Sequence, residues 1–343
     1  MQYTTRSHIL LNARRRQVLT TGLGLGLSAF SLGIARANTA VKGDLVLYTS
    51  QLLQDAQQTV AAFEQTHPHV KVRWVRDGTT QLLTKLRAEF AAGAPQPDVL
   101  LIADELAMAG LKREDRLQPY KDAPFEGFPA SLREPGGYWY GTKLITTGIA
   151  YNTAAKMTPK RWWDLQQPEA LGQIDMPSPL YSGAAMVMVE AFTQHPNLGW
   201  KYYDMLAKQK TIAQGGNGGV FKNVSSGAKL YAALVDFLAI RSEQKGAPIR
   251  FVFPEEGVSA VTEPVAVLKT ARNVDAARAF IDFCLSASGQ ELVARQGMMP
   301  ARVGITPPLG FPKLGSFKLL NVDADRALDT VEADKKRFSA LFV

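Results

Sequence analysis

Three carboxylates stand in an otherwise apolar, strand-like segment, residues 253–269, which reads FPEEGVSAVTEPVAVLK. Glu255 and Glu256 are adjacent, and adjacent residues of a strand point to opposite faces, so they could act as general acid and base only inside a turn. A proline and a glycine flank the pair and favour such a turn. No G-x-S-x-G, H-E-x-x-H or Cys/His arrangement accompanies it. We therefore expect no enzymatic activity, with a hydrolase that uses Glu255 and Glu256 as the alternative.

Hydroxyl residues and glycines recur where helices are expected to begin. A helix N-terminus offers free backbone N–H groups and a partial positive charge, and small residues let an anion approach the backbone. The same residue types are also ordinary helix caps and turn residues, so each position taken alone has a purely structural interpretation. Their recurrence makes them candidates for holding a phosphate, phosphonate or carboxylate. The candidates are Thr49, Ser50, Thr79, Thr80, Ser182, Gly183, Asn217 and Gly218.

Nucleophile and metal chemistry have little support in the sequence. Cys284 is the only cysteine and lies in an apolar stretch with helical spacing, so we expect a buried, inert thiol. Beyond the first 37 residues the histidines are His67, His69 and His195, and each stands beside a proline in a turn-like context. The sequence therefore predicts no metal site and no cofactor.

Alternating strands and helices must position the candidates. The expected order is a buried strand at residues 44–50, a helix at 51–68, a strand at 70–76, a helix at 79–93 and a strand at 97–104. This alternation indicates a parallel α/β sheet. Parallel sheets bind ligands beyond the carboxyl ends of their strands, where the following helices begin. The first hydroxyl candidates fall at those ends.

Two later segments indicate that the chain leaves this sheet and comes back. Residues 141–153 are rich in β-branched side chains and predict a strand that crosses out of the sheet, and residues 259–271 predict a strand that returns. The segment between them carries its own helices, and a charged helical tail begins near residue 322. Two such units would face their ligand-binding ends toward each other across a cleft. That geometry suits capture better than catalysis.

The first 37 residues have the pattern of an export signal. Three arginines at residues 14–16 precede an uncharged apolar run that ends in Ala-Arg-Ala at residues 35–37, an A-x-A cleavage site. Residues 15–19, RRQVL, resemble a twin-arginine signal, and an ordinary arginine-rich secretory signal is the alternative. Either signal predicts that the mature protein is exported.

Removal of this segment changes the charge of the protein. The whole chain has a formal net charge of +8, and the segment carries five arginines and no acid, so the mature chain has 8 − 5 = +3. A charge this small gives no reason to propose a nucleic-acid partner, and no Lys/Arg stripe interleaved with aromatic residues is present. The charge is compatible with a small anionic ligand.

Several segments together resemble the periplasmic solute-binding proteins of ABC importers, in the branch that contains ferric-ion, phosphonate and sugar-phosphate binders. They are LYTS running into a helix, PDVLLIADELAM, TGIAYNT, and the stretch from FPEEG to ELV followed by MMPAR. The resemblance covers nearly the whole mature chain. It implies a type II two-lobed α/β fold, with two parallel-rich sheets joined by crossing hinge strands and a C-terminal helical tail. It also implies a periplasmic monomer that delivers its ligand to an inner-membrane ABC permease.

The resemblance also implies domain boundaries. Lobe 1 is expected to be discontinuous, lobe 2 to lie between its two parts, and the tail to pack on lobe 1. The expected boundaries are 1–37 for the signal peptide, 38–146 and 262–310 for lobe 1, 147–261 for lobe 2 and 311–343 for the tail.

The residues that match the family's iron site argue against iron. Ferric binders of this family hold the metal with adjacent tyrosines after a strand of the second lobe, commonly with a histidine from the first loop. The matching strand, residues 231–240, offers Asp-Phe-Leu at 236–238, and Leu52 stands where the histidine would be. The pair Tyr202 and Tyr203 lies in an amphipathic stretch instead. Because Fe(III) prefers anionic oxygen donors, we expect a phosphonate such as 2-aminoethylphosphonate or a sugar phosphate, with ferric iron or an iron chelate as the alternative.

The same resemblance suggests roles for the acids. In sugar-phosphate binders of this branch, acids at similar positions accept hydrogen bonds from ligand hydroxyls, and in an aminophosphonate binder they could neutralise an ammonium. Asp236 and Glu256 are the expected acidic pair, and Glu255 is expected to face solvent. Three residues stay open between a ligand contact and a structural role: Glu263, Tyr48 and Tyr181.

Overall fold

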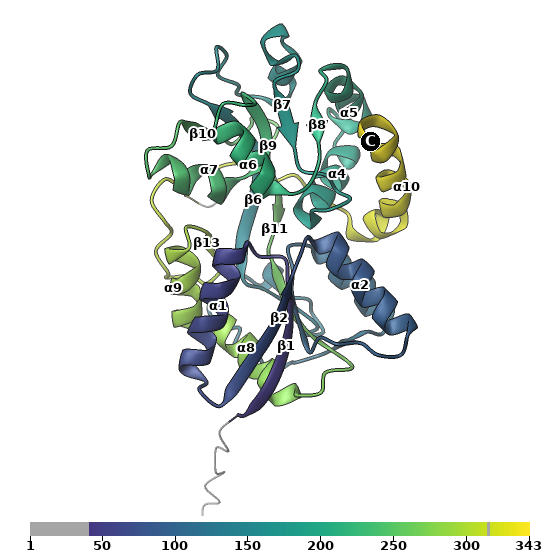
Figure 1. The fold of residues 1–343 in the computed structure, drawn as a ribbon, viewed down its shortest axis with the longest axis vertical. Coiled ribbons are helices and arrows are strands. Elements are labelled where there is room, and N and C mark those ends of the chain that lie inside the picture. Colours follow the sequence, from purple (N-terminus) through teal and green to yellow (C-terminus); the bar gives the residue numbers. More distant parts are fainter. Residues whose placement is uncertain (1–40, 314–315) are drawn as a thin grey trace, which may run out of the picture. The chain divides into compact units, whose positions relative to one another are not determined.

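The computed structural model describes residues 41–313 and 316–343, so the expected export signal at residues 1–37 lies outside the described residues. Within the described ranges, no helix is long and apolar enough to cross a membrane. From residue 41 onward the chain forms two α/β lobes, each built around one sheet (Figure 1). We name them lobe 1 and lobe 2 after their order in the chain.

The sheet of lobe 1 has the strand order β2-β1-β3-β12-β4, with β5 beside β12. Strand β1 runs parallel to β2 and β3, whereas β12 returns from lobe 2 and runs antiparallel to β3, β4 and β5. The sheet is therefore mixed, and the expectation of a parallel-rich sheet is wrong in this detail. The strands are β1 (Gly43–Thr49), β2 (Val70–Arg76), β3 (Val99–Leu101), β4 (Leu117–Gln118), β5 (Tyr140–Gly141) and β12 (Pro264–Leu268).

Helices cover both faces of this sheet because successive side chains of a strand point to opposite faces. In β1, Leu45 and Leu47 pack with Phe63 and Phe280 of α1 and α8, whereas Tyr48 belongs to a second cluster on the α2 side. The helices of lobe 1 are α1 (Leu53–Thr66), α2 (Thr79–Ala91), α3 (Glu105–Arg113), α8 (Val274–Leu285) and α9 (Ala287–Arg295), with a 3₁₀ turn η1 (Ala130–Leu132).

The sheet of lobe 2 has the order β10-β6-β9-β7-β8, with β11 and β13 beside β6. Strand β7 is parallel to β8 and β9, and β6 is antiparallel to its four neighbours. This sheet is also mixed. The strands are β6 (Lys143–Asn152), β7 (Ile174–Met176), β8 (Ile212–Ala213), β9 (Tyr231–Val235), β10 (Ile249–Val252), β11 (Ser259–Val261) and β13 (Met299–Pro300).

An aromatic cluster forms much of the core of lobe 2. Trp162, Phe192, Tyr202 and Tyr203 are buried and their rings meet mostly edge to face. The helices of this lobe are α4 (Gly183–Gln194), α5 (Gly199–Lys208), α6 (Asn217–Ser225) and α7 (Asp236–Glu243), with 3₁₀ turns η2 (Trp162–Gln166) and η3 (Pro168–Ala170). The segment 231–240, expected to be one strand, thus ends as strand at Val235 and continues as helix.

Two of the connections between the lobes lie next to each other (Figure 1). Strand β6 begins directly after β5, and β11 ends directly before β12. The backbone N–H groups of Thr142 and Lys143 both donate to the carbonyl oxygen of Thr262, at 2.9 and 3.1 Å, so the two connections are hydrogen-bonded to each other. The returning strand is broken at Glu263, whose φ is +42°. This left-handed backbone conformation is unfavourable for a residue with a side chain and marks the point where the pairing changes sheets.

The C-terminal helix α10 (Ala324–Phe342) contacts both lobes. It lies against α4 and α5 of lobe 2 (Figure 1) and also contacts α3 of lobe 1. Phe338 is buried in the core of lobe 2, and Asp329 accepts from Arg113 of α3 at 3.3 Å. The expectation that the tail packs on lobe 1 is therefore wrong in part, because the apolar face of α10 is buried mainly by lobe 2.

Candidate functional site

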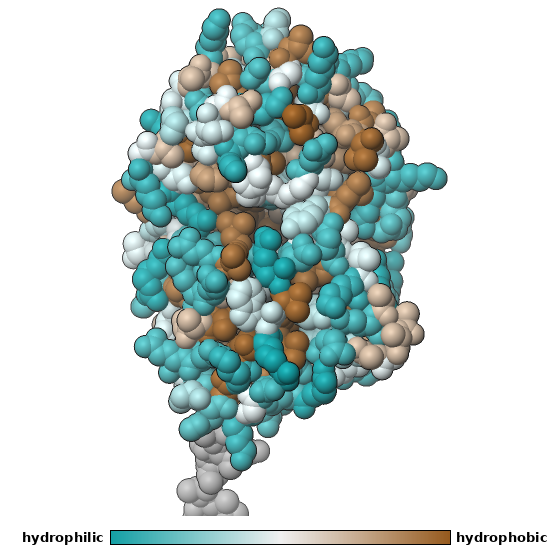
Figure 2. All heavy atoms as spheres, viewed as in Figure 1, coloured by the Kyte–Doolittle hydropathy of each residue, from teal (hydrophilic) through white to brown (hydrophobic). Residues whose placement is uncertain are grey.

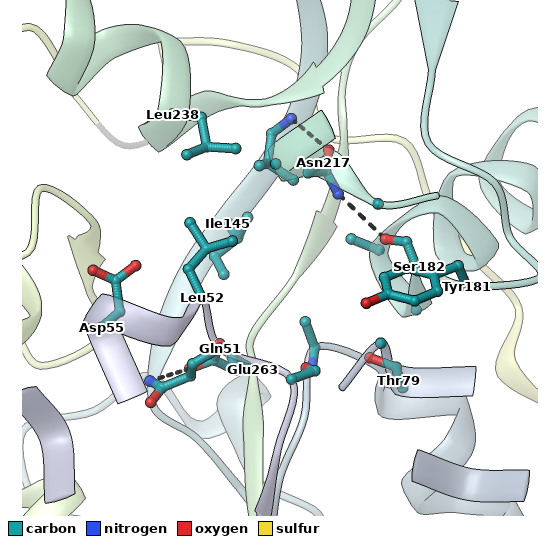
Figure 3. A pocket seen from close by; sticks show the side chains of 18 of the residues that line it. Gln51, Leu52, Asp55, Thr79, Ile145, Tyr181, Ser182, Asn217, Leu238 and Glu263 are labelled. Carbon is teal, nitrogen blue, oxygen red and sulfur yellow. Dashed lines mark hydrogen bonds between the residues drawn. The ribbon is translucent and has the colours of Figure 1, made fainter. Parts of the chain in front are cut away.

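A cavity of about 470 Å³ lies between the two lobes, within the range typical of small-molecule sites. The loop after β1 and the starts of α1, α2, α4 and α6 surround it, together with the crossing strand β6. In the space-filling view, apolar residues border a recess near the middle of this face (Figure 2). The labelled side chains in Figure 3 approach the cavity from both lobes.

Six of the predicted ligand contacts line this cavity. Two of them are linked to each other, since Asn217 Nδ2 donates to Ser182 Oγ at 3.2 Å (Figure 3). Asn217 Oδ1 also accepts from the backbone N–H of Val235 at 3.2 Å, which fixes the carboxamide. The six are Ser50, Thr79, Ser182, Gly183, Asn217 and Gly218.

Three helices begin at the cavity without a side-chain cap. The residues that precede α1, α2 and α6 are Leu52, Gly78 and Gly216, and none of them accepts a capping hydrogen bond. Helix α4 differs, because Ser182 Oγ accepts from the N–H of Ala185 at 3.3 Å. Uncapped N-termini leave backbone donors and a partial positive charge at the cavity, which an anion could satisfy.

Two glycines at these helix starts are required by the close approach of the lobes. A Cβ on Gly78 would lie 2.5 Å from the carbonyl oxygen of Tyr181, and one on Gly183 would lie 2.6 Å from that of Ala103. Each contact joins one lobe to the other. A larger residue at either position would hold the lobes apart.

Of the charged side chains that line the cavity, only that of Arg76 has no ion pair within the described parts of the chain, and Asp77, the next residue, accepts from Tyr181 Oη at one end of the cavity. Among the lining residues, Asp55 is paired with Arg241 at 3.2 Å, and Glu263 is paired with the buried Lys143. Arg76, at the end of β2, also lines the cavity, and its Nε donates to the carbonyl oxygen of Gln51 at 2.7 Å. No salt bridge of Arg76 is found among the described residues. Both acids are therefore neutralised and one guanidinium charge is left over.

Glu263 has the structural role that the sequence left open, and it also borders the cavity. Its Oε2 accepts from Lys143 Nζ and from Gln51 Nε2, the latter at 3.1 Å, and Thr142 Oγ1 donates to its carbonyl oxygen at 2.9 Å. These contacts hold the crossing point of the two connections. The residue is 3% exposed and also lines the floor of the cavity (Figure 3).

Hydrogen bonds between the lobes close one end of the cavity. Tyr181 Oη donates to Asp77 Oδ1 at 3.1 Å, and Gln81 Nε2 donates to the carbonyl oxygen of Leu180 at 3.1 Å. Thr80 Oγ1 donates to the carbonyl oxygen of Pro179 at 3.1 Å, so this predicted contact joins the lobes and is not part of the cavity lining. Tyr181 does line the cavity.

Asp236 does not line the cavity, contrary to the expectation from the resemblance. It begins α7, where its Oδ2 accepts from Thr146 N at 3.0 Å and Thr146 Oγ1 at 2.7 Å, and its Oδ1 accepts from Phe237 N at 2.7 Å. Burial raises the pKa of this carboxyl to about 7, although these hydrogen bonds oppose the shift. The carboxyl group thus ties α7 to the crossing strand β6.

Glu256 also lies outside the cavity lining. Its Oε2 accepts from the backbone N–H of Trp162 at 3.1 Å, at the start of η2. Trp162 Nε1 in turn donates to the carbonyl oxygen of Gly257 at 2.8 Å, which holds the turn against the core of lobe 2. Glu255 is exposed, which confirms its expected position. The two adjacent glutamates therefore serve the turn, and neither faces the cavity.

Thr49 is a further correction at the first strand, and Tyr48, which the sequence left open, has a structural role. Thr49 is fully buried, and its Oγ1 accepts from the N–H of Gln51 at 3.2 Å, so it shapes the loop without lining the cavity. Tyr48 packs in the core of lobe 1, and its Oη donates to Glu89 at 2.6 Å. Burial and the Glu89 carboxylate raise the pKa of this phenol well above its usual value.

The tyrosine pair of lobe 2 and the cysteine are core residues. Tyr202 and Tyr203 are 0% and 1% exposed, and burial raises the pKa of each phenol well above its usual value, so neither is an available phenolate. Burial likewise raises the pKa of Cys284 to about 12. Within residues 41–313 and 316–343, no three His, Cys, Asp or Glu residues are grouped as a metal site would require.

Sequence reasoning missed several residues of the cavity. Arg76 ends the second strand, and Ser50 directly follows the first strand, so the same end-of-strand argument could have found Arg76. Asp55 and Arg241 carried no such signal, because they lie on helices 186 residues apart in the chain. Gln51 was assigned to the first helix, although it lies in the loop before it.

The comparisons with known proteins agree with this geometry. The family described as bacterial extracellular solute-binding protein matches residues 94–327. An uncharacterised protein of Haemophilus influenzae is 28% identical over 325 residues, which cover 89% of this chain and 92% of the relative. A probable ABC transporter periplasmic-binding protein of Sinorhizobium fredii is 23% identical, over 77% of this chain and 76% of the relative.

Solved structures are similar in fold. The periplasmic binding protein AfuA of Actinobacillus pleuropneumoniae, with fructose-6-phosphate bound, gives a TM-score of 0.80 at 23% identity, covering 88% of this chain and 99% of the other. Iron-bound HitA of Pseudomonas aeruginosa gives 0.74 at 20% identity, covering 86% and 99%. These likenesses confirm the expected two-lobed α/β fold of periplasmic binding proteins.

Proposed function

Because the chain belongs to the family of bacterial extracellular solute-binding proteins, we propose that it captures a small organic anion and delivers it to an ABC importer. The ligand is a phosphonate, such as 2-aminoethylphosphonate, or a sugar phosphate. Capture needs no chemical step, only closure of two lobes that both contact the ligand. The alternative of a hydrolase has no support at Glu255 and Glu256, which lie outside the cavity lining.

The observation that carries this proposal is the unbalanced charge of Arg76. Both acids of the cavity are already paired, with Arg241 and Lys143, so the guanidinium of Arg76 is the charge that a ligand would neutralise. An anion that enters this partly desolvated site gains a charge-assisted hydrogen bond from Arg76. A cation would meet the same charge with repulsion.

The anionic group is proposed to sit where α2 and α6 begin, which we call the polar side of the cavity. The uncapped N-termini of α2 and α6 begin there, and the hydroxyl and carboxamide groups beside them can donate to phosphoryl or phosphonyl oxygens. Arg76 adds the formal charge. The proposed contacts are Ser50, Thr79, Ser182, Gly183, Asn217, Gly218 and Arg76.

Glu263 and Gln51 are proposed to recognise a donor group of the ligand. The Glu263 carboxylate already accepts two hydrogen bonds through Oε2 and lines the floor of the cavity, so it can accept a further one from an ammonium or hydroxyl group. An amine or hydroxyl group that reaches Glu263 while the anionic group contacts Arg76 would distinguish an organic anion from inorganic phosphate.

The proposed location is the periplasm, and the proposed partner is the inner-membrane permease of an ABC transporter. The arginine-rich pattern of residues 1–37 supports export, by a twin-arginine or an ordinary secretory route. The related periplasmic-binding protein of Sinorhizobium fredii supports the transporter. The protein is proposed to act as a monomer.

Ferric iron takes second place as a ligand. AfuA with a bound sugar phosphate and HitA with bound iron are both similar in fold, so fold alone does not choose between them. The donors at the cavity favour an organic anion over iron, since the acids of the cavity are paired with cations and the buried Tyr202 and Tyr203 lie elsewhere.

Thermal-shift measurements test the proposed ligand class. The purified protein is screened against 2-aminoethylphosphonate, glucose 6-phosphate, inorganic phosphate and ferric citrate. A ligand at 100 times its Kd stabilises the folded state by about 2.7 kcal/mol, which is easily seen. Stabilisation by ferric citrate with a visible charge-transfer band, and by no phosphorus compound, would overturn the proposal.

Arg76→Gln is the matched variant for the charge. It is expected to weaken binding of the stabilising anion by on the order of 10- to 100-fold, as expected for a charged hydrogen bond. The control is Arg73→Gln on the same strand, because Arg73 is exposed and paired with Asp44 at 2.6 Å, away from the cavity. Equal effects of the two substitutions would remove Arg76 from the site.

A further inference from the structure

One side of the cavity is apolar. Leu52, Ile145 and Leu238 lie together on this side, opposite Thr79, Tyr181 and Ser182 (Figure 3). Val235, Phe237 and Met298 also line the cavity, and all of these apolar residues belong to or pack against one hydrophobic cluster, which is formed mainly by lobe 2. Leu52 comes from lobe 1 and closes this side when the lobes meet. We call Leu52, Ile145 and Leu238 the apolar wall.

A polar group beside the apolar wall is already satisfied. Asp55 lies beyond Leu52 on this side, and both of its carboxylate oxygens accept from Arg241, at 3.2 and 3.3 Å (Figure 3). The side chains of the apolar wall themselves carry no hydrogen-bonding atom. A ligand hydroxyl turned toward these side chains would therefore lose water without gaining a hydrogen bond from any of them, which is unfavourable.

The cavity is much larger than an anionic head group. A tetrahedral oxyanion occupies on the order of 100 Å³, or about three times the ~30 Å³ share of one water molecule. The cavity volume is about 470 Å³. An anionic group therefore leaves most of the cavity volume for the rest of the ligand.

We propose that the body of the ligand is a hydrocarbon or aromatic group seated against Leu52, Ile145 and Leu238. This inference rests on the proposed function, in which the anionic group occupies the polar side. It selects between the two proposed ligand classes: phosphonates or phosphate monoesters with an apolar body are preferred over sugar phosphates, because only the apolar body gains from leaving water at this wall. Leu52 contributes to binding only in the closed state, so an apolar body also favours closure.

A series of phosphate monoesters with one common head group tests the proposal. Binding of phenyl phosphate, n-butyl phosphate, glucose 6-phosphate and inorganic phosphate to the purified protein is measured by isothermal titration calorimetry. We expect phenyl or butyl phosphate to bind at least about tenfold more tightly than glucose 6-phosphate, the scale of one or two methylene groups in an apolar pocket. Binding to the apolar side also predicts a negative heat-capacity change.

The outcomes separate this inference from the proposed function. If glucose 6-phosphate binds as tightly as the apolar esters or more tightly, the inference is overturned and the proposed anion site stands. If inorganic phosphate binds and neither apolar ester binds better, the inference is likewise overturned. If none of the four compounds binds and ferric citrate does, the proposed function fails, and the inference fails with it.

Leu238→Ala tests whether the apolar wall contacts the ligand, and Leu234→Ala is its matched control. Both leucines are buried in the same hydrophobic cluster, but only Leu238 lines the cavity. Leu238→Ala is expected to reduce the ratio of phenyl phosphate to inorganic phosphate affinity by about tenfold. Leu234→Ala is expected to lower the melting temperature and leave that ratio unchanged. Equal ratios in the two variants would overturn the assignment of the wall.

Leu52→Ala keeps the test decisive if Leu238→Ala does not fold. Leu52 lies in a loop and is only partly buried, so its truncation costs less stability. Circular dichroism verifies the fold of each variant before titration. Loss of the preference for the apolar esters in Leu52→Ala supports the wall, and an unchanged preference contradicts it.

Discussion

Arg241 and Asp55 form an ion pair that joins the two lobes beside the cavity. Arg241 Nη1 of α7 donates to Asp55 Oδ1 of α1 at 3.2 Å and to Oδ2 at 3.3 Å, and it also donates to the carbonyl oxygen of Gln296 at 3.0 Å. The side chain of Asp55 is only 5% exposed. Because the partners belong to different lobes, the pair contributes to the closed state and not to the open one.

Arg241→Ala is therefore expected to shift the protein toward the open state. Loss of a half-buried ion pair would destabilise closure by ~1–2 kcal/mol, which lowers ligand affinity by about tenfold. Small-angle scattering should show a larger radius of gyration for the ligand-free variant than for the original protein. Titration calorimetry gives the change in Kd.

The control for this substitution is Arg250→Ala. Arg250 pairs with Glu243 at 3.2 Å within lobe 2, and the pair is largely exposed, so its loss should leave closure unchanged. If Arg241→Ala and Arg250→Ala have the same affinity and the same radius of gyration, the ion pair between the lobes has no part in closure.

Glu263→Gln is expected to destabilise the fold strongly. Lys143 is 2% exposed and paired with Glu263, so removal of the carboxylate leaves a buried ammonium without its counter-charge. Breaking a buried pair in this way costs about 3–5 kcal/mol. The measurement is urea unfolding, with the exposed Glu255→Gln as a control that should change the free energy of unfolding by less than about 0.5 kcal/mol.

The double variant Glu263→Gln/Lys143→Met tests the cause of that loss. Since it removes both charges, it should recover much of the stability lost in Glu263→Gln. No recovery in the double variant would mean that the destabilisation comes from the backbone at residue 263 and not from the unpaired ammonium.

Asp236→Ala is expected to reduce stability and not ligand recognition. The substitution leaves the N–H and hydroxyl of Thr146 and the N–H of Phe237 without their acceptor, at a cost of about 2 kcal/mol. At 20 °C, where the variant stays folded, its Kd should lie within about threefold of the original. If the free energy of unfolding is unchanged and the affinity falls strongly, Asp236 is part of the ligand site after all.

Stability is expected to fall as the pH rises from about 4.5 to about 8, with Glu190 as one cause. Burial in α4 and the nearby Asp334 of α10 raise the pKa of Glu190 from its usual 4.5 to about 7. Between these values the folded protein keeps a proton that the unfolded chain has lost, so unfolding is favoured as the pH rises through this window. The contribution is present below pH 4.5 and lost above pH 7.

Glu190→Gln should remove this part of the pH dependence. At pH 8 the neutral carboxamide avoids both the buried charge and the repulsion from Asp334, so the variant is expected to be more stable by ~1–3 kcal/mol. Near pH 4.5 the two proteins should have similar melting temperatures. A variant that is less stable than the original at pH 8 would show that the charged form of Glu190 is stabilising.

The strand and helix order of lobe 1 could be predicted because it depends on local pattern. The strand expected at residues 44–50 is β1, Gly43–Thr49, and the expected helix starts at Thr79 and Ser182 lie where the structure has them within one residue. Most hydroxyl and glycine candidates at these helix starts line the cavity, since helices that follow parallel strands begin at the same edge of a sheet.

The acids could not be assigned from the sequence, because their roles depend on partners far away in the chain. Glu256 resembles a ligand contact in its turn, yet its carboxylate accepts from Trp162, 94 residues earlier. Glu263 was undecided until its contacts with Lys143 and Gln51 were known, the latter across 212 residues. A resemblance to a family does not fix which acid of a segment faces the cavity.

The sequence by itself therefore determined the α/β elements, the crossing of the chain between two lobes and the small residues that begin the helices of the site. These features follow from hydrophobic periodicity and from the local needs of turns and caps. Only the tertiary structure decided the electrostatics of the cavity, with Asp55 and Glu263 neutralised and Arg76 left over, and the docking of α10 on both lobes. The net charge of the cavity and the packing of α10 depend on residues that are far apart in the sequence and meet only in the folded structure.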